Sequence, residues 1–256
     1  MKTKLRVSIL LAISVILIQS CGKGLQDPSK ITANLSEVAT GSTVLLDAKT
    51  ITGTCPASLT WNDSSGNGNN GTINCTVGGS VSTTPSRVIF DGTNTTVSTA
   101  LSATSTDMPE ATWVAWVKPT ASGFSHILSI DDHAGAFNRS LTLENSAGDK
   151  FGVFNRNPNG SWEATTASLN QWQFLVVEFT PTNIVLQKNG SRFTYGSAPN
   201  YNNNALTFTI GSSPALFDFF TGEIAWVAIY PRILTSTEIR QTCLALVNRF
   251  VGASCD

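Results

Sequence analysis

The chain has 256 residues, of which 41% are hydrophobic and only 13% are charged, and its formal net charge is −1 at pH 7. This weak negative charge excludes a nucleic-acid-binding protein that relies on phosphate contacts. The 20 glycines and the abundant Ser, Thr and Asn residues are typical of an exported, β-rich domain with a polar but uncharged surface, and the length suits a single all-β sandwich.

The first 21 residues have the features of an export signal. Lys2, Lys4 and Arg6 precede an apolar run over residues 7–18, and Ser20 and Cys21 follow it. The run is shorter than the roughly 20 apolar residues that a membrane-spanning helix needs. A basic start, a short apolar stretch and small residues before a cleavage point predict a signal peptide over residues 1–20.

The end of this signal resembles the lipobox of bacterial lipoproteins, in which the cysteine is acylated and the chain is cut before it. The resemblance implies lipidation of Cys21 and an anchor in the bacterial cell envelope. Gly22 at the next position favours the outer membrane. Exposure of the domain on the cell surface is compatible with this anchor but is left open by the sequence. Loss of the signal leaves 13 basic against 17 acidic residues. The alternative is an ordinary signal peptide with a chance cysteine.

The mature chain divides into a tether and one domain. Residues 21–41 are polar without sustained periodicity and are predicted to be a flexible tether. Residues 42–256 contain short apolar runs between Gly, Asn, Pro and Ser clusters, which predict successive β-strands. The clearest runs are 44–46, 87–90, 111–117, 124–130, 171–179 and 206–210. The run 171–179 has few polar positions and is predicted to be a central strand, whereas 206–210 alternates and should have one buried and one solvated face.

Two further elements have specific signals. Residues 184–188 and 192–195 flank Asn189-Gly190, which supplies the positive φ angles of a tight hairpin turn. Near the C-terminus, Thr235 and Glu238 form a capping box, and Leu234 and Ile239 are spaced as a hydrophobic staple. The helix that follows should place one face on the body of the domain. That face comprises Ile239, Cys243, Leu246, Val247 and Phe250.

Apart from Cys21, four cysteines remain, an even number in a compartment that permits oxidation. Four cysteines allow three pairings. We favour Cys55 with Cys75 and Cys243 with Cys255, because each pair brackets one short segment. A zinc site is disfavoured because no pair has the close Cys-x-x-Cys spacing.

Three blocks of the sequence, in order, resemble the laminin G-like domains of the concanavalin A-like lectin/glucanase superfamily. They are the Gly-Asn loop 61–72 (WNDSSGNGNNGT), the segments 90–92 (FDG) and 112–119 (TWVAWVKP), and the closing segment 220–239 with FTGEI at its start. The resemblance covers about residues 45–249. It implies an all-β, concanavalin A-like jelly-roll sandwich of two antiparallel sheets with one C-terminal helix.

The Gly-Asn loop is the predicted metal site. Members of this family often bind a structural calcium ion here, and calcium takes 6–8 oxygen ligands. The resemblance implies Asp63, Asn67 and Asn69 as ligands, with Asp91 contributing from a neighbouring strand. The alternative is an Asx-rich turn held by its own hydrogen bonds. This alternative is strengthened because Ala225 and Trp226 stand where the family often has two acids.

An enzymatic function is disfavoured by the sequence. Retaining glycosidases place two carboxylates about 5 Å apart, yet the glutamates are scattered singly along the chain, and no Gly-x-Ser-x-Gly nucleophile motif accompanies His126 and His133. The glutamates of the predicted domain (42–256) are Glu110, Glu144, Glu163, Glu178, Glu223 and Glu238. A divergent glycoside hydrolase is therefore the least favoured function.

Glycan binding requires exposed aromatic rings beside hydrogen-bonding side chains. Trp162 is the best candidate because it follows the polar turn that begins at Asn157, and Asp132 lies in a second polar segment. These three residues are the predicted ligand site, although a core position for Trp162 is the alternative. Four other tryptophans fall in apolar strands and are predicted to be core. They are Trp113, Trp116, Trp172 and Trp226.

The predicted function is a non-catalytic, membrane-anchored binding module for a glycan or an extracellular protein. A structural or interaction component of the cell envelope is the second reading. Both share a lipid-anchored sandwich domain, and they differ in whether the partner is foreign to the cell or part of it.

Overall fold

The computed structural model describes residues 40–53, 59–74, 80–104, 106–131, 139–145, 148–155, 161–196 and 205–256. All of them belong to one unit, Thr32–Asp256. The predicted signal peptide (1–20), Cys21 and almost all of the predicted tether (21–41) lie outside these residues. In the part of the chain described, no helix is long and apolar enough to cross a membrane.

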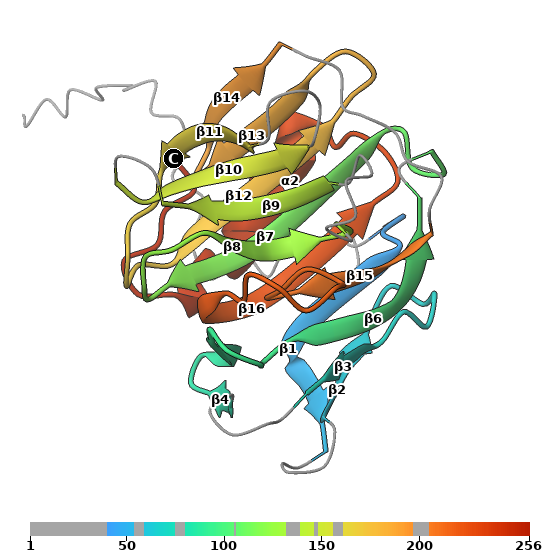
Figure 1. Ribbon diagram of the computed structural model, residues 1–256, viewed down its shortest axis with the longest axis vertical. Helices are drawn as coiled ribbons and strands as arrows, with labels where there is room; N and C mark the ends of the chain where they lie inside the picture. The colour runs from blue at the N-terminus through green and yellow to red at the C-terminus, as the bar shows by residue number, and fades with distance from the viewer. Residues whose placement is uncertain are drawn as a thin grey trace, which may run out of the picture. The chain divides into compact units, whose positions relative to one another are not determined.

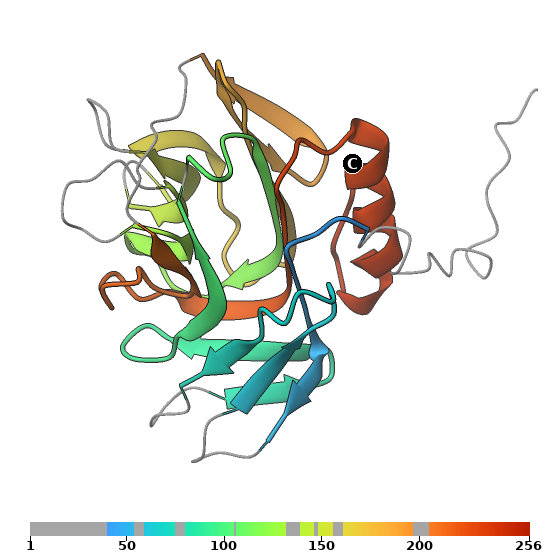
Figure 2. The same ribbon diagram turned by 90° about the vertical axis from the view of Figure 1, so that its right-hand side faces the viewer.

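The described strands are all antiparallel and follow one hydrogen-bonded path that doubles over into two layers (Figures 1 and 2). The front sheet contains β6 (Val97–Ala103), β15 (Leu206–Ile210), β8 (Ser125–Ser129), β9 (Arg139–Glu144), β10 (Lys150–Asn155) and β11 (Ser161–Thr166). The back sheet contains β1 (Val44–Thr52), β16 (Thr221–Tyr230), β7 (Ala111–Pro119), β12 (Gln173–Phe179), β13 (Ile184–Lys188) and β14 (Ser191–Tyr195). Between them lie β3 (Gly71–Ile73) and β2 (Leu59–Asp63), while β4 (Ser80–Thr83) and β5 (Ser86–Asp91) pair beside β16. The predicted all-β sandwich is confirmed.

The central strands of the back sheet, β16, β7 and β12, are buried on both faces. One cluster of apolar side chains fills the space between the two sheets, and a second lies between the back sheet and the C-terminal helix. Along β7, Trp113 belongs to the first cluster and Trp116 to the second. This explains why β12 lacks alternation: it pairs with β7 and β13 on its two edges and is buried throughout. The predicted core positions of Trp113, Trp116, Trp172 and Trp226 are confirmed.

The C-terminal helix α2 (Ser236–Leu246) covers the outer side of the back sheet (Figure 2). Its capping box is present as predicted, because the Thr235 hydroxyl accepts from the Glu238 N–H and the Glu238 carboxylate accepts from the Thr235 N–H. The predicted helical face was too long at its C-terminal end. The α-helix ends at Leu246 and a short 3-10 helix, η2 (Val247–Arg249), follows. There Arg249 donates two hydrogen bonds to the Asp47 carboxylate of β1, at 2.8 and 2.9 Å.

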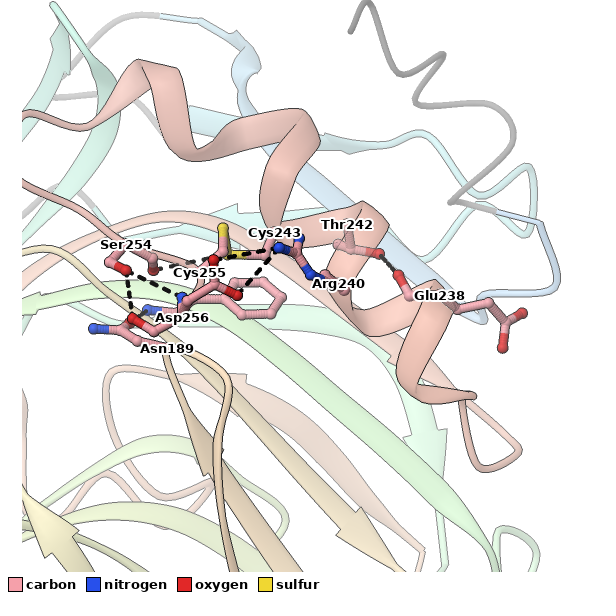
Figure 3. Close-up of a disulfide and its surroundings, with 9 residues drawn as sticks. Asn189, Glu238, Arg240, Thr242, Cys243, Ser254, Cys255 and Asp256 are labelled. Carbon is pink, nitrogen blue, oxygen red and sulfur yellow. Dashed lines mark hydrogen bonds and ion pairs between the residues drawn. A yellow bond between two sulfur atoms is a disulfide. The ribbon is translucent and has the colours of Figure 1, made fainter. Parts of the chain in front are cut away.

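A disulfide joins α2 to the last residues of the chain (Figure 3). It links Cys243 to Cys255, as predicted, whereas Cys55 and Cys75 lie outside the described residues. The β13–β14 hairpin turn lies against the same segment. Asn189 and Gly190 have the positive φ angles predicted for the turn, and a Cβ on Gly190 would lie 2.6 Å from the Cys255 carbonyl oxygen. Glycine is therefore required here both by the turn and by the close backbone approach.

Candidate functional site

The Gly-Asn loop is held by hydrogen bonds of its own residues. The Asp63 carboxylate accepts from the Leu45, Ser65 and Asn69 amides and from the Ser65 hydroxyl, at 2.7–2.9 Å. These four bonds fill the lone-pair directions of the two oxygens. Asn67 and Asn69 donate through their side-chain amides to the Ser42 and Thr43 carbonyls, at 2.9 and 2.8 Å. The loop therefore fastens the start of β1 to β2.

Asp91 has a different environment at the end of β5. Its Oδ1 accepts from the amides of Thr93, Asn94 and Thr95, each at 3.0 Å, and its Oδ2 is buried without a hydrogen bond of normal geometry. Burial acts to raise the pKa of Asp91, but these amide donors outweigh it and lower the pKa to about 2. The carboxylate is thus ionised, with one oxygen that a cation or a water molecule could still use.

The sheet register separates the two halves of the predicted calcium set. Asp91 is opposite Thr221 on β16, whereas Asp63 is opposite Leu46 of β1, which in turn is opposite Val227. Thr221 and Val227 are six residues apart, or about 20 Å along a strand. One ion cannot contact both carboxylates. In the described residues no group of three or more His, Cys, Asp or Glu side chains is placed to hold a metal, and calcium binding stays a prediction.

Trp162 lies on β11, on the side that faces the interior of the sandwich. It packs against the core cluster, and its ring stacks on that of Tyr195 in β14, with the ring centroids 5.5 Å apart. Because β11 and β14 are the two ends of the strand path, this stack closes one edge of the sandwich. The other two predicted ligand residues, Asn157 and Asp132, lie outside the described residues, so the sequence-predicted ligand site stays a prediction.

The outer face of the front sheet carries polar side chains that are withdrawn from water. We use "outer face" for the side of β8–β11 and β15 that points away from the core. On β9, Leu141 and Leu143 point into the core, so Ser140, Thr142 and Glu144 point outward. The outward residues of this face on the other four strands include His126, Ser129, Lys150, Gly152, Phe154, Ser161, Glu163 and Thr209.

Several of these outward groups bond to one another. The hydroxyl oxygens of Ser129 and Ser140 are 2.7 Å apart, and Thr209 donates to the Ser212 carbonyl at 2.7 Å. All four side chains are buried, although alternation in β15 predicted a solvated face for Thr209. Buried hydroxyls are costly unless hydrogen-bonded, and these form a satisfied polar floor beside the exposed part of the face.

Glu144 is the central acid of this face. Only 6% of its surface is exposed, and it lies across Gly152 of β10, where a Cβ would come within 2.8 Å of the Glu144 Cγ. The Thr142 hydroxyl donates to its Oε1 at 2.5 Å. Burial raises the pKa of Glu144 and the charge of Glu163 adds to this, while hydrogen bonds from Thr142 and Ser161 act in the opposite direction. A small residue at position 152 is what lets the carboxyl lie flat on the sheet.

A second carboxylate lies two strands away, on the far side of β10. Glu163 of β11 is opposite Gly152, and its Oε2 is 2.9 Å from the Lys150 ammonium, both side chains being partly exposed. We call Thr142, Glu144, Lys150, Ser161 and Glu163 the Glu144 cluster. The two glutamates are far apart in the sequence, and only the pairing of β9, β10 and β11 brings them together. Their environments differ, since one is buried and the other is ion-paired.

Apolar rings border the cluster. Phe154 follows Gly152 by two residues on β10, and its ring is 6.4 Å from that of Phe124 and 6.2 Å from that of His126. The loop before β16 adds Leu216 and Phe217, and it is joined to β8 by a bond from the His126 amide to the Asp218 carbonyl at 2.9 Å. Phe124, Leu216 and Phe217 are 37%, 53% and 56% exposed. These rings, with Leu216, form an apolar rim on the outer face.

Two sequence signals could have indicated this site. The period-two alternation of Arg139–Glu144 places Ser140, Thr142 and Glu144 on one side, and Gly152 interrupts the next apolar strand. Neither signal specifies that Glu163 is the neighbour, because strand pairing is a tertiary property.

A separate pocket of about 230 Å³ lies on the opposite side of the domain. Its lining includes Phe174, Val176 and Ile239, together with Arg192 and Arg240. Both arginines have acidic partners: Arg192 binds the buried Glu178 and Arg240 lies 3.2 Å from Asp256 (Figure 3). This pocket is a gap between α2 and the β13–β14 hairpin whose charges are already compensated.

These features define a lectin-like β-sandwich domain. The family model described as "Concanavalin A-like lectin/glucanases superfamily" matches residues 91–240. The chain belongs to this superfamily, as its sequence motifs predicted. No curated protein sequence matches the chain.

Solved structures share the fold at low sequence identity. Domain 4 of a GH43 extracellular arabinanase from Geobacillus stearothermophilus, in complex with arabinotriose, is 16% identical with a TM-score of 0.58, and the match covers 80% of this chain and 98% of that domain. Trypanosoma rangeli sialidase is 14% identical with a TM-score of 0.57, over 81% of this chain. The match spans only 33% of the sialidase chain. At these identities the similarity establishes the fold alone.

The raised pKa of Glu144 makes the stability of the domain depend on pH. The folded state favours the protonated carboxyl, so this contribution is fully present below the ordinary value of 4.5 and is lost as the pH rises through the higher folded pKa. We expect Glu144→Gln to raise the melting temperature at pH 8 and to have little effect near pH 4. Thermal unfolding between pH 3.5 and 8 measures this, and Glu110→Gln, which changes an exposed glutamate outside the Glu144 cluster, is the control. An equal effect of Glu144→Gln at both ends of the range would contradict it.

Calcium binding can be tested at the two separated positions. If an ion uses the free oxygen of Asp91, calcium should raise the melting temperature of chelator-treated protein by a few degrees, and Asp91→Asn should abolish the increase. Asn67→Ala is the matched change in the Gly-Asn loop and should leave the response intact. A melting temperature that calcium does not alter would show that the metal prediction is wrong.

Proposed function

We propose that this domain is a non-catalytic binding module for a glycan, held at the bacterial cell envelope by a lipid on Cys21. The observation that carries the proposal is the outer face of the front sheet, where the Glu144 cluster lies beside the ring of Phe154. Carboxylates, hydroxyls and an ammonium group can bond to sugar hydroxyls, while an aromatic ring packs on the apolar face of a sugar.

The structural similarities support the same choice. Domain 4 of the arabinanase has this fold and was solved with arabinotriose, and this chain corresponds to nearly all of that domain. A glycan is favoured over an extracellular protein because the partly exposed groups beside Phe154 are the polar side chains of Lys150, Ser161 and Glu163, whereas a protein interface has an apolar core.

Glycan binding should be measured on a glycan array and then by calorimetry with the best ligand. We expect Phe154→Ala to weaken binding about fivefold, since an aromatic contact contributes roughly 1 kcal/mol. Arg240→Ala, at the pocket beside α2, is the matched control on the opposite side and should have no effect. A lack of saturable binding across the array would contradict the proposal.

The same samples separate binding from catalysis. Two carboxylates in different environments are the arrangement that acid–base hydrolysis uses, so the runner-up function is a divergent glycoside hydrolase. We expect no release of reducing sugar from the bound glycan. Release that Glu144→Gln abolishes would make the protein an enzyme.

The anchor is tested in cells. We expect metabolic labelling with palmitate to label the protein and Cys21→Ser to remove the label and release the protein from the membrane fraction, because one or more buried acyl chains supply the membrane affinity. An unlabelled wild-type protein would contradict lipidation and the outer-membrane localisation together.

A further inference from the structure

We infer that the glycan bound by the outer face is uncharged, and that the face discriminates against sugars that carry a carboxylate. This inference rests on the proposed glycan-binding function and specifies the class of ligand. It depends on the charges of the Glu144 cluster and on how they are already paired.

The lysine of this face, Lys150, already has an acidic partner. Among the described outward side chains of β8–β11 and β15, the carboxylates are Glu144 and Glu163, and Lys150 is the only lysine or arginine; His126 is buried beside Asp218. The Lys150 ammonium lies 2.9 Å from Glu163. A sugar carboxylate that bonded to Lys150 would have to share the ammonium with Glu163, so that two carboxylates would lie against one cation, beside Glu144.

The anions of the face add to this barrier. The two glutamates are close enough for the charge of Glu163 to raise the pKa of Glu144, so a third negative charge would be opposed by both. At the rim, Asp218 contributes another carboxylate, whose Oδ2 lies 3.7 Å from His126. Like charges in a partly desolvated site reject a ligand as effectively as a steric clash does.

A neutral sugar meets complementary groups instead. Its hydroxyls can donate to the glutamate oxygens and accept from Ser161 and Lys150, without separating the existing ion pair. Phe154 lies two residues from Gly152 on β10, or about 7 Å, which is close to the length of one sugar ring. One ring can therefore pack on Phe154 while the next reaches the Glu144 cluster.

The test compares glycans that differ only in charge. Cello-, galacto- and manno-oligosaccharides are each measured in native form and after oxidation of their primary hydroxyls to carboxylates, and lactose is paired with α2,3-sialyllactose. We expect the neutral member of every pair that binds to bind at least tenfold more tightly. Glu163→Gln should narrow or reverse this ratio, because it removes one negative charge and releases Lys150.

Two further variants keep the result interpretable. Asp256→Asn removes an acid on the opposite side of the domain and should leave the ratio unchanged. Lys150→Met removes the cation itself, so a loss of acidic-glycan binding in this variant would identify an anion site and overturn the inference, even if Glu163→Gln does not fold.

The two proposals fail in different ways. Tighter binding of the acidic members by the wild-type protein overturns the inference and leaves the glycan-binding function standing. Failure of the wild-type protein to bind any member of the pairs, or any glycan on the array, overturns the function and the inference with it.

Discussion

The domain depends on the double burial of its central strands. β16 pairs with β7 along one edge and with β5 and then β1 along the other, and its apolar side chains are divided between the two core clusters. A sheet that is apolar on both sides must be covered on both sides. The front sheet packs on one side of these strands and α2 on the other, so both are required to bury the apolar side chains of the central strands.

This constraint assigns different tasks to the two sides of the molecule. On the back, α2 is fixed by its capping box, by the Cys243–Cys255 disulfide and by the Arg249–Asp47 pair. On the front, the loop before β16 packs over part of the outer face, and Ser129, Ser140 and Thr209 are buried there. Lys150 and Glu163 of the Glu144 cluster remain partly exposed.

The Gly-Asn loop and the Glu144 cluster differ in what their polar groups can do. In the loop, the Asp63 carboxylate accepts hydrogen bonds from groups of the loop and of β1, and these bonds hold β1 and β2 together. In the cluster, Lys150 and Glu163 are paired but partly exposed, and Glu144 is held in place by Thr142. The second arrangement keeps donors and acceptors near the surface, as recognition of a polar ligand requires.

The sequence by itself predicted the fold class, the hairpin at Asn189-Gly190 and the start of α2, because turn residues, caps and strand alternation act over a few neighbouring positions. The superfamily followed from the resemblance of three sequence blocks to known members, and Cys243–Cys255 belonged to the favoured one of three possible pairings. Only the tertiary structure decided that Asp63 and Asp91 are about 20 Å apart along the sheet, that Trp162 closes an edge of the sandwich on Tyr195, and that Glu144 and Glu163 share one face. These facts depend on which strands pair and in which register, and a single strand does not carry that information.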